Sequence, residues 1–128
     1  MSPPRPTQAH PNPVPSEIRI RRASRTLEVD FDDDAKVVLP AEYLRVESPS
    51  AEVQGHGPNE RKIVPGKATV NIAAVEPIGH YAVRIRFTDG HDTGIYTWAY
   101  LHRLGHEYPD RWQAYLEGLA VKGMRREP

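Results

Sequence analysis

The 128-residue chain contains no cysteine. Disulfides, thiolate nucleophiles, cysteine-ligated zinc and thiolate-held iron–sulfur clusters are therefore excluded, because each of them requires a cysteine sulfur. No apolar run approaches the roughly 20 residues of a membrane-spanning helix. The N-terminus also lacks the apolar core of a signal peptide. The sequence therefore predicts a cytoplasmic protein without a membrane partner.

The chain also lacks an excess of charge of either sign, since 17 Lys and Arg residues balance 17 Asp and Glu residues. Proteins that bind nucleic acid without sequence preference concentrate basic side chains, which displace counterions. The densest basic cluster here is Arg19, Arg21, Arg22 and Arg25, and acidic residues follow it directly. The composition therefore argues against a nucleic-acid partner, and the length predicts a single domain.

Proline is concentrated at the N-terminus, where six of the 13 prolines fall within the first 15 residues. Residues 1–15 have few apolar side chains and few free amides, so we expect them to form a disordered tail. The domain itself is expected to span residues 16–121. The closing residues 122–128 are expected to be frayed.

Alternation of apolar and polar residues predicts an antiparallel meander. We expect strands over residues 18–20, 27–31, 37–39, 70–74, 81–87 and 95–96. Two C-terminal helices are predicted by apolar residues at helical spacing: Trp98, Leu101 and Leu104, then Trp112, Tyr115, Leu116 and Leu119. Gly105 is expected to end the first helix. The predicted fold is α+β, with a small antiparallel β-meander packed by the two C-terminal helices.

No catalytic signature is complete in the sequence. His102 and His106 have the i, i+4 spacing of zinc proteases, but Arg103 stands where that motif requires Glu. Because Gly105 is expected to turn His106 away, we interpret both as surface histidines. No His is followed two residues later by the carboxylate of a non-haem iron site. The nucleophile elbow of serine hydrolases and the phosphate-binding and dinucleotide glycine motifs are also absent.

Residues 89–98 gather carboxylates, a histidine and glycines between a strand and a helix. Asp89, His91 and Asp92 suit a divalent metal or a proton relay, because a carboxylate beside a histidine orients its tautomer. The same segment also suits a plain turn, in which Asp89-Gly90 reverses the chain and Gly94 permits a close approach. Both interpretations stay open at this point.

Residues 48–58 form the second unusual segment. Glu52, Gln54 and His56 lie in a loop with Gly55 and Gly57, either as binding groups or as part of an ordinary surface loop. The two segments make one site only if they meet within the roughly 10 Å that shared ligands allow.

Together the two segments carry a family resemblance. The matching residues are Leu44-Arg45, the stretch Ser-Pro-Ser-Ala-Glu-Val-Gln-Gly-His-Gly at 48–57, the stretch Asp-Gly-His-Asp-Thr-Gly-Ile-Tyr at 89–96, and residues 98–101. On these residues the chain resembles the gamma-butyrobetaine hydroxylase-like N-terminal domain family. The likeness spans residues 16–120, and we expect a standalone bacterial member.

The resemblance also implies a metal site. In gamma-butyrobetaine hydroxylase the small domain precedes an iron and 2-oxoglutarate catalytic domain, and it binds zinc through three cysteines and one histidine. The resemblance places Ser48, Ser50 and Val53 at the cysteine positions and His91 at the histidine position. Hydroxyls are poor zinc ligands and valine is none, so no cofactor is expected and the zinc site is expected to be lost. His91 stays as a candidate metal ligand.

The expected function is that of a noncatalytic accessory or protein-interaction module with an unidentified protein partner. The resemblance implies a link to iron–sulfur cluster assembly or to an iron/2-oxoglutarate enzyme system. The alternative is a small metal-binding or general-base enzyme that uses the Asp89-His91-Asp92 turn. A partner subunit would expose an aromatic patch around Tyr96 and Tyr100. The candidate binding surface comprises Glu52, Gln54, His56, Asp89, His91, Asp92 and Tyr96.

Overall fold

The computed structural model describes residues 13–55 and 61–128. Its elements are β1 (Pro15–Arg21), β2 (Thr26–Phe31), β3 (Lys36–Pro40), α1 (Ala41–Val46), α2 (Ala51–Gln54), β4 (Ile72–Ile78), β5 (Ala82–Phe87), β6 (Ile95–Thr97), α3 (Trp98–His106) and α4 (Tyr108–Val121). The expected disordered tail, residues 1–15, lies outside the described residues except for its last three. None of the described helices is long and apolar enough to cross a membrane.

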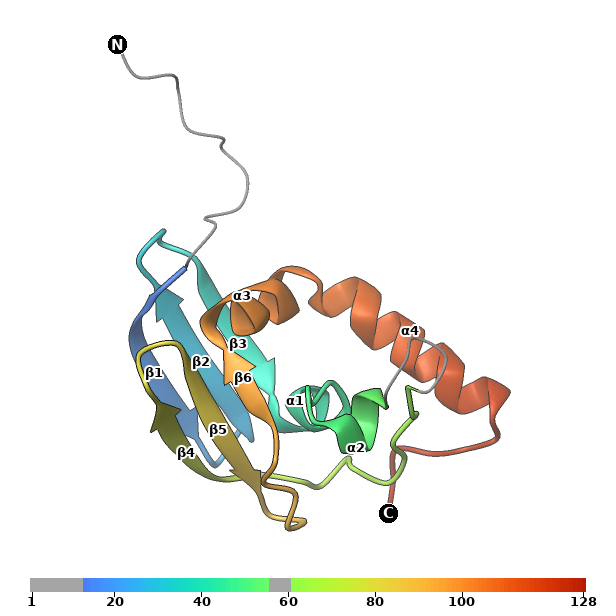
Figure 1. Ribbon diagram of the computed structural model, residues 1–128. Coiled ribbons are helices and arrows are strands. Elements are labelled where there is room, and N and C mark those ends of the chain that lie inside the picture. The colour runs from blue at the N-terminus through green and yellow to red at the C-terminus, as the bar shows by residue number, and fades with distance from the viewer. Residues whose placement is uncertain (1–12, 56–60) are drawn as a thin grey trace.

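The strands form two three-stranded antiparallel sheets with the orders β1-β2-β3 and β4-β5-β6. The alternation of apolar and polar residues that predicted the strands also determines which face of each strand is buried. Leu27, Val29 and Phe31 of β2 are buried, whereas the residues between them are partly exposed. The predicted α+β class, with antiparallel strands and two C-terminal helices, is confirmed (Figure 1). The strands form two sheets, however, where a single meander sheet was predicted.

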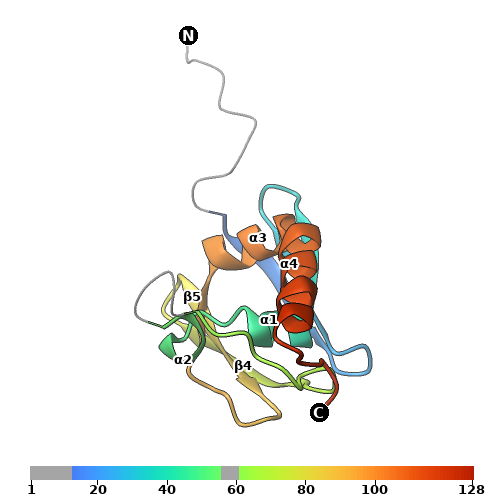
Figure 2. The same ribbon diagram turned by 90° about the vertical axis from the view of Figure 1, so that its right-hand side faces the viewer.

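One apolar core joins the inner faces of both sheets to α1 and α3. α4 extends away from the sheets (Figure 1), and its Tyr115 and Leu119 pack with Val46 of α1 in a second, smaller cluster. In Figure 2, α4 points towards the viewer and is foreshortened, with α1 next to it. The hydroxyl of Tyr43 on α1, which is fully buried, donates to the Leu104 carbonyl of α3 at 2.7 Å. α1 therefore connects both clusters.

Gly105 does not end a helix, contrary to the prediction. It lies inside α3, where a Cβ atom would be 2.7 Å from Val37 Cβ and closer still to Val37 Cγ1. The missing side chain therefore allows α3 to pack closely on β3. Because the helix continues, His106 is not turned away from His102, and their ring centroids lie 5.2 Å apart. His102 is also not a surface residue, since it is buried and its Nε2 lies 2.9 Å from Asp33 Oδ2.

The chain after α4, which we expected to be frayed, makes specific contacts. The amides of Gly66 and Ala68 donate to the carbonyls of Arg125 and Arg126 at 2.9 and 3.0 Å. The Arg126 guanidinium also donates to both carboxylate oxygens of the buried Glu42, at 2.7 and 2.8 Å. A bidentate pair of this kind anchors the segment because it satisfies a buried charge.

Candidate functional site

The two polar segments singled out in the sequence are in direct contact. Ser48 Oγ lies 2.9 Å from His91 Nε2, and Glu52 Oε2 lies 3.2 Å from His91 Nδ1. The Ser50 and Thr93 hydroxyls are 2.8 Å apart. The segment between α1 and α2 therefore packs directly on the connection between β5 and β6. We call Ser48, Ser50, Glu52, His91 and Thr93 the serine–histidine cluster.

A tight turn after β5 brings His91 into this cluster. Gly90 has a φ of +93°, and its amide donates to the Phe87 carbonyl at 3.0 Å. The carboxylate of Asp89 accepts the His91 amide at 3.0 Å. Glycine is suited to this position because a positive φ is costly for residues with a side chain. The Asp-Gly pair therefore forms the turn, and His91, only 7% exposed, lies beneath it.

On the facing segment, Ser50 caps the short helix α2 by accepting the Glu52 amide at 3.3 Å. This places the Glu52 carboxylate beside the imidazole. The Ser50 amide donates to Ser48 Oγ at 3.3 Å, so the Ser48 hydroxyl is free to donate to His91 Nε2. The His91 proton then lies on Nδ1, from which it is donated to Glu52. Both ring nitrogens of His91 are thus engaged.

The environment of His91 favours the neutral imidazole. Burial is the main cause that lowers its pKa, and the nearby Arg45 charge lowers it further. The Glu52 carboxylate opposes both effects but does not outweigh them. His91 is therefore uncharged at neutral pH.

Asp89 is not the partner of the His91 ring. Its Oδ2 accepts from Arg45 Nε at 2.8 Å and from Lys67 Nζ at 2.7 Å. Burial alone would raise the pKa of Asp89, but the hydrogen bonds from Lys67, the His91 amide and Arg45 lower it to about 2. The carboxylate is therefore ionised and bound to two cations. Neither Arg45 nor Lys67 was among the candidates, and Lys67 had no motif that could have indicated it.

The remaining candidates lie in different places. Gln54 contributes to the same region, since its Nε2 donates to the Ser48 carbonyl at 2.8 Å. Asp92 is partly exposed beside the cluster, and His56 lies outside the described residues. Tyr96 is fully buried, so its ring is not part of a surface.

The expected aromatic patch around Tyr96 and Tyr100 does not form. Tyr96 donates its hydroxyl to the Leu44 carbonyl at 2.6 Å, and Tyr100, which is partly buried, donates to the Glu47 carbonyl at 2.5 Å. Both hydroxyls therefore hold the α1 end against the β6–α3 segment.

The order hydroxyl, imidazole, carboxylate in the serine–histidine cluster is that of a serine hydrolase triad. Reaction would require an acyl group to reach Ser48 Oγ. Ser48 is fully buried, and a Cβ atom on Gly94 would already lie 2.6 Å from this oxygen. There is no room for a tetrahedral centre at this oxygen, and the hydrogen bonds of the cluster hold the two segments together.

The residues at the family's zinc-ligand positions do not fit the ion. Ser48 Oγ is hydrogen bonded to His91 Nε2, and Ser50 Oγ is hydrogen bonded to Thr93 Oγ1. Val53 is buried and has no donor atom. Zinc requires about four strong nitrogen, sulfur or carboxylate ligands. Within residues 13–55 and 61–128, no three His, Cys, Asp or Glu side chains are grouped so that they could hold a metal ion.

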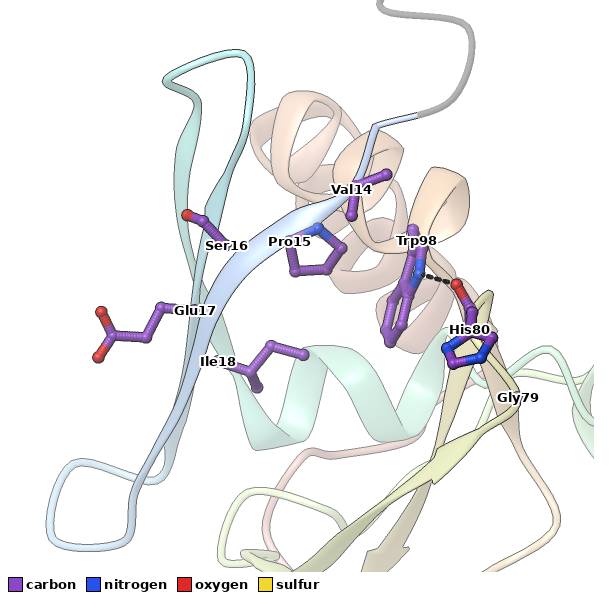
Figure 3. Close-up of a pocket in the computed structure, with 8 residues that line it drawn as sticks. All are labelled: Val14, Pro15, Ser16, Glu17, Ile18, Gly79, His80 and Trp98. Carbon is purple, nitrogen blue, oxygen red and sulfur yellow. Dashed lines mark hydrogen bonds between the residues drawn. The ribbon is translucent and has the colours of Figure 1, made fainter.

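A groove open to solvent lies elsewhere on the molecule, between β1, the β4–β5 turn and the start of α3 (Figure 3). Its volume is about 450 Å³, and it is lined by Val14, Pro15, Ser16, Glu17, Ile18, Gly79, His80 and Trp98. Trp98 is held by a 2.8 Å hydrogen bond from its Nε1 to the His80 carbonyl. Sequence inspection missed this groove because its residues come from three distant segments. We call it the Trp98 groove.

The sequence profile of the family described as gamma-butyrobetaine hydroxylase-like, N-terminal, matches residues 18–102. The chain belongs to this family. The resemblance seen in the sequence is thus confirmed, and the family match includes every residue of the serine–histidine cluster. No curated protein matches the chain.

Solved structures of the same fold are similar over most of the chain. Two proteins determined by NMR in solution are 46% and 43% identical, with TM-scores of 0.79 and 0.80. The first match covers 91% of this chain and 92% of the other, and the second covers 95% and 91%. A protein of unknown function from Acidithiobacillus ferrooxidans, assigned to the DUF971 family, is 47% identical, with a TM-score of 0.61. That match covers 71% of this chain and 91% of the other.

Proposed function

We propose that this protein is a noncatalytic protein-interaction module that works without the zinc of its family. One contrast supports the proposal. Ser48 and His91, the nucleophile and the base that a catalytic site would need, are buried and hydrogen bonded to each other, and His91 also pairs with Glu52. The Trp98 groove, in contrast, is open and lined largely by apolar side chains. An enzyme would need the opposite arrangement, with reactive groups in the open site.

The partner that fits the Trp98 groove is an extended segment of another protein. β1 is an edge strand, since β2 is its one strand neighbour in the described sheets. Edge strands present backbone groups that pair with an added strand. Val14 is 47% exposed at one end of the groove, and Ile18 and Trp98 lie along it (Figure 3). A segment that pairs with β1 would place an apolar side chain against Trp98.

The Trp98 groove lies between the β1 edge of one sheet and the β4–β5 turn of the other. Near the start of β4 their edges are joined, because Arg22 donates to the Ala73 carbonyl and Asn71 donates to the Arg22 carbonyl, both at 3.0 Å. The Trp98 groove lies towards the other end of β1. An added strand at β1 would therefore fill the space between the two sheet edges.

The family resemblance described in the sequence analysis implies the kind of system in which the partner acts. We propose that the partner belongs to iron–sulfur cluster assembly or to an iron/2-oxoglutarate enzyme system. In that role the chain supplies a docking surface and no thiolate ligand for a cluster, since it has no cysteine.

The test is a binding measurement with purified proteins of these systems, after affinity capture has identified those that bind the full chain. Val14→Glu places a charge in the groove and should weaken binding by about tenfold or more, because that charge would be buried against apolar groups. Val121→Glu is the matched control, since Val121 is 86% exposed at the end of α4. The control should bind like the wild type.

Two results would contradict the proposal. If Val14→Glu binds the partner as tightly as the control does, the groove is not the docking surface. If a fluorophosphonate probe labels Ser48 in the folded protein, the serine–histidine cluster is reactive and the enzyme alternative is favoured instead.

A further inference from the structure

A second hollow, of about 150 Å³, lies between the end of α1, residues 61–63 and α4. Its apolar wall consists of Val46, Ile63, Ala114 and Tyr115. Its polar wall consists of Arg61, Lys62, Arg111 and Glu47. The volume equals that of about five water molecules in the liquid, so a small ionised group on a short apolar stem can enter.

The one carboxylate that lines this hollow, that of Glu47, already accepts hydrogen bonds from two arginines. The Glu47 carboxylate, 3% exposed, accepts Arg61 Nη2 at 2.5 Å and Arg111 Nη1 at 2.8 Å on the same oxygen, Oε1. Arg111 also donates from Nε to Glu107 at 2.7 Å. Three cationic side chains, including Lys62, thus face two carboxylates. Among the described residues, this set therefore carries one positive charge that no carboxylate balances.

The basic groups also keep donors available. A guanidinium has five N–H groups, and Arg61 uses one of them within the described chain, towards Glu47. The Lys62 ammonium has no partner among the described residues, and Lys62 is exposed. Arg111 is held in place, since its guanidinium also lies 5.8 Å from the centre of the Tyr100 ring. A ligand would therefore find one well-held cation, Arg111, and two exposed ones, Arg61 and Lys62, with little ordering cost at Arg111.

We propose that Arg61, Lys62 and Arg111 form a binding site for a carboxylate group that is carried on a short apolar stem. A single negative charge balances the surplus charge, whereas a phosphate dianion would bring a second charge close to the buried Glu47. The guanidinium forks match a carboxylate, and the wall formed by Val46, Ile63 and Ala114 receives the stem. This site is separate from the Trp98 groove and does not depend on the proposed interaction there.

The ligand chemistry has two sources, a free short-chain carboxylate or an acidic side chain of a protein. The full chain, labelled with ¹⁵N, is titrated with butyrate, with an acetylated and amidated tetraglutamate peptide, and with inorganic phosphate. We expect saturable shifts of the Ile63, Ala114 and Tyr115 amides with at least one carboxylate probe. Tighter binding of butyrate identifies a free carboxylate, and tighter binding of the peptide identifies an acidic protein segment.

Variants test whether the named cations bind the probe. In Arg61→Gln with Lys62→Gln, Arg111 still pairs with Glu47, so the fold is retained, and the affinity should fall at least about tenfold. The control is Arg84→Gln. The Arg84 side chain is 38% exposed, close to the 39% of Arg61, and it pairs with Glu76 in the β4-β5-β6 sheet.

Three outcomes would overturn the proposal. The first is the absence of saturable shifts with both carboxylate probes. The second is tighter binding of phosphate than of either carboxylate. The third is an equal loss of affinity in the control and in the double variant, because that would indicate nonspecific charge attraction.

Discussion

Replacement of His91 by alanine tests whether the serine–histidine cluster holds the fold together. The change removes two hydrogen bonds, from Ser48 Oγ at 2.9 Å and to Glu52 at 3.2 Å. Each such bond contributes about 1 kcal/mol to stability, and the one to the charged Glu52 somewhat more. Ser48 is fully buried, so its hydroxyl would lose its acceptor, at a further cost of about 1 kcal/mol or more.

The missing ring would also leave a space beneath the turn, and a space of this kind adds to the loss of stability. The total should be about 3 kcal/mol. For a domain of this size the melting temperature should then fall by about 10–15 °C. The assay is thermal and urea unfolding followed by circular dichroism, with the midpoint and the slope both fitted.

Two variants sharpen this test. His80→Ala changes an exposed histidine of the β4–β5 turn and should stay within about 0.5 kcal/mol of the wild type. His91→Phe fills the space without restoring the hydrogen bonds, so it should recover only part of the loss. If His91→Ala melts within about 2 °C of the wild type, the imidazole is not structural. Its nitrogens would then be available to a ligand, and the noncatalytic interpretation would fail.

Four further outcomes are expected. Because burial lowers the pKa of His91, the unfolded state binds a proton on this residue more readily than the folded state does, so stability should fall as the pH drops below about 6.5. In His91→Phe the urea midpoint should no longer show this His91-dependent fall. If the pH profile of the variant equals that of the wild type, the prediction is wrong. Gly90→Val should lower the melting temperature markedly, since a β-branched residue is strained at a φ of +93°. Gly105→Ala should destabilise the protein although alanine favours helices by about 1 kcal/mol, and Val37→Ala in the same chain should restore part of the stability because the clash is with Val37. Addition of Zn²⁺ to the purified protein should leave its melting temperature unchanged, and a saturable rise would show that the ion binds.

Local patterns accounted for most of the secondary structure. The alternation in residues 27–31 and 81–87 predicted strands with one buried face, and Asp89-Gly90 predicted the turn that the structure shows. These features depend on neighbours within a few residues, so they are legible in the sequence. The helix over residues 98–104 was also predicted, but its end was misplaced, because the role of Gly105 depends on Val37, 68 positions away.

The candidate site was likewise predictable only where it depends on local sequence. Glu52, Gln54, Asp89 and His91 were identified as unusual from their types and their glycine-rich surroundings. The carboxylate that orients the His91 ring was predicted among its sequence neighbours, Asp89 and Asp92, whereas Glu52, 39 residues away, occupies that position. Tyr96 was included as a surface residue, although alternation along β6 places it in the core.

The sequence by itself determined which chemistry is unavailable, which segments form strands and helices, and to which family the chain belongs. Only the tertiary structure decided that the two polar segments meet, that His91 is buried with both nitrogens bonded, and that open hollows lie beside Trp98 and Arg61. The physical reason is that side-chain periodicity is a local property of the backbone. Contacts between distant segments arise from the way in which the core packs the elements together.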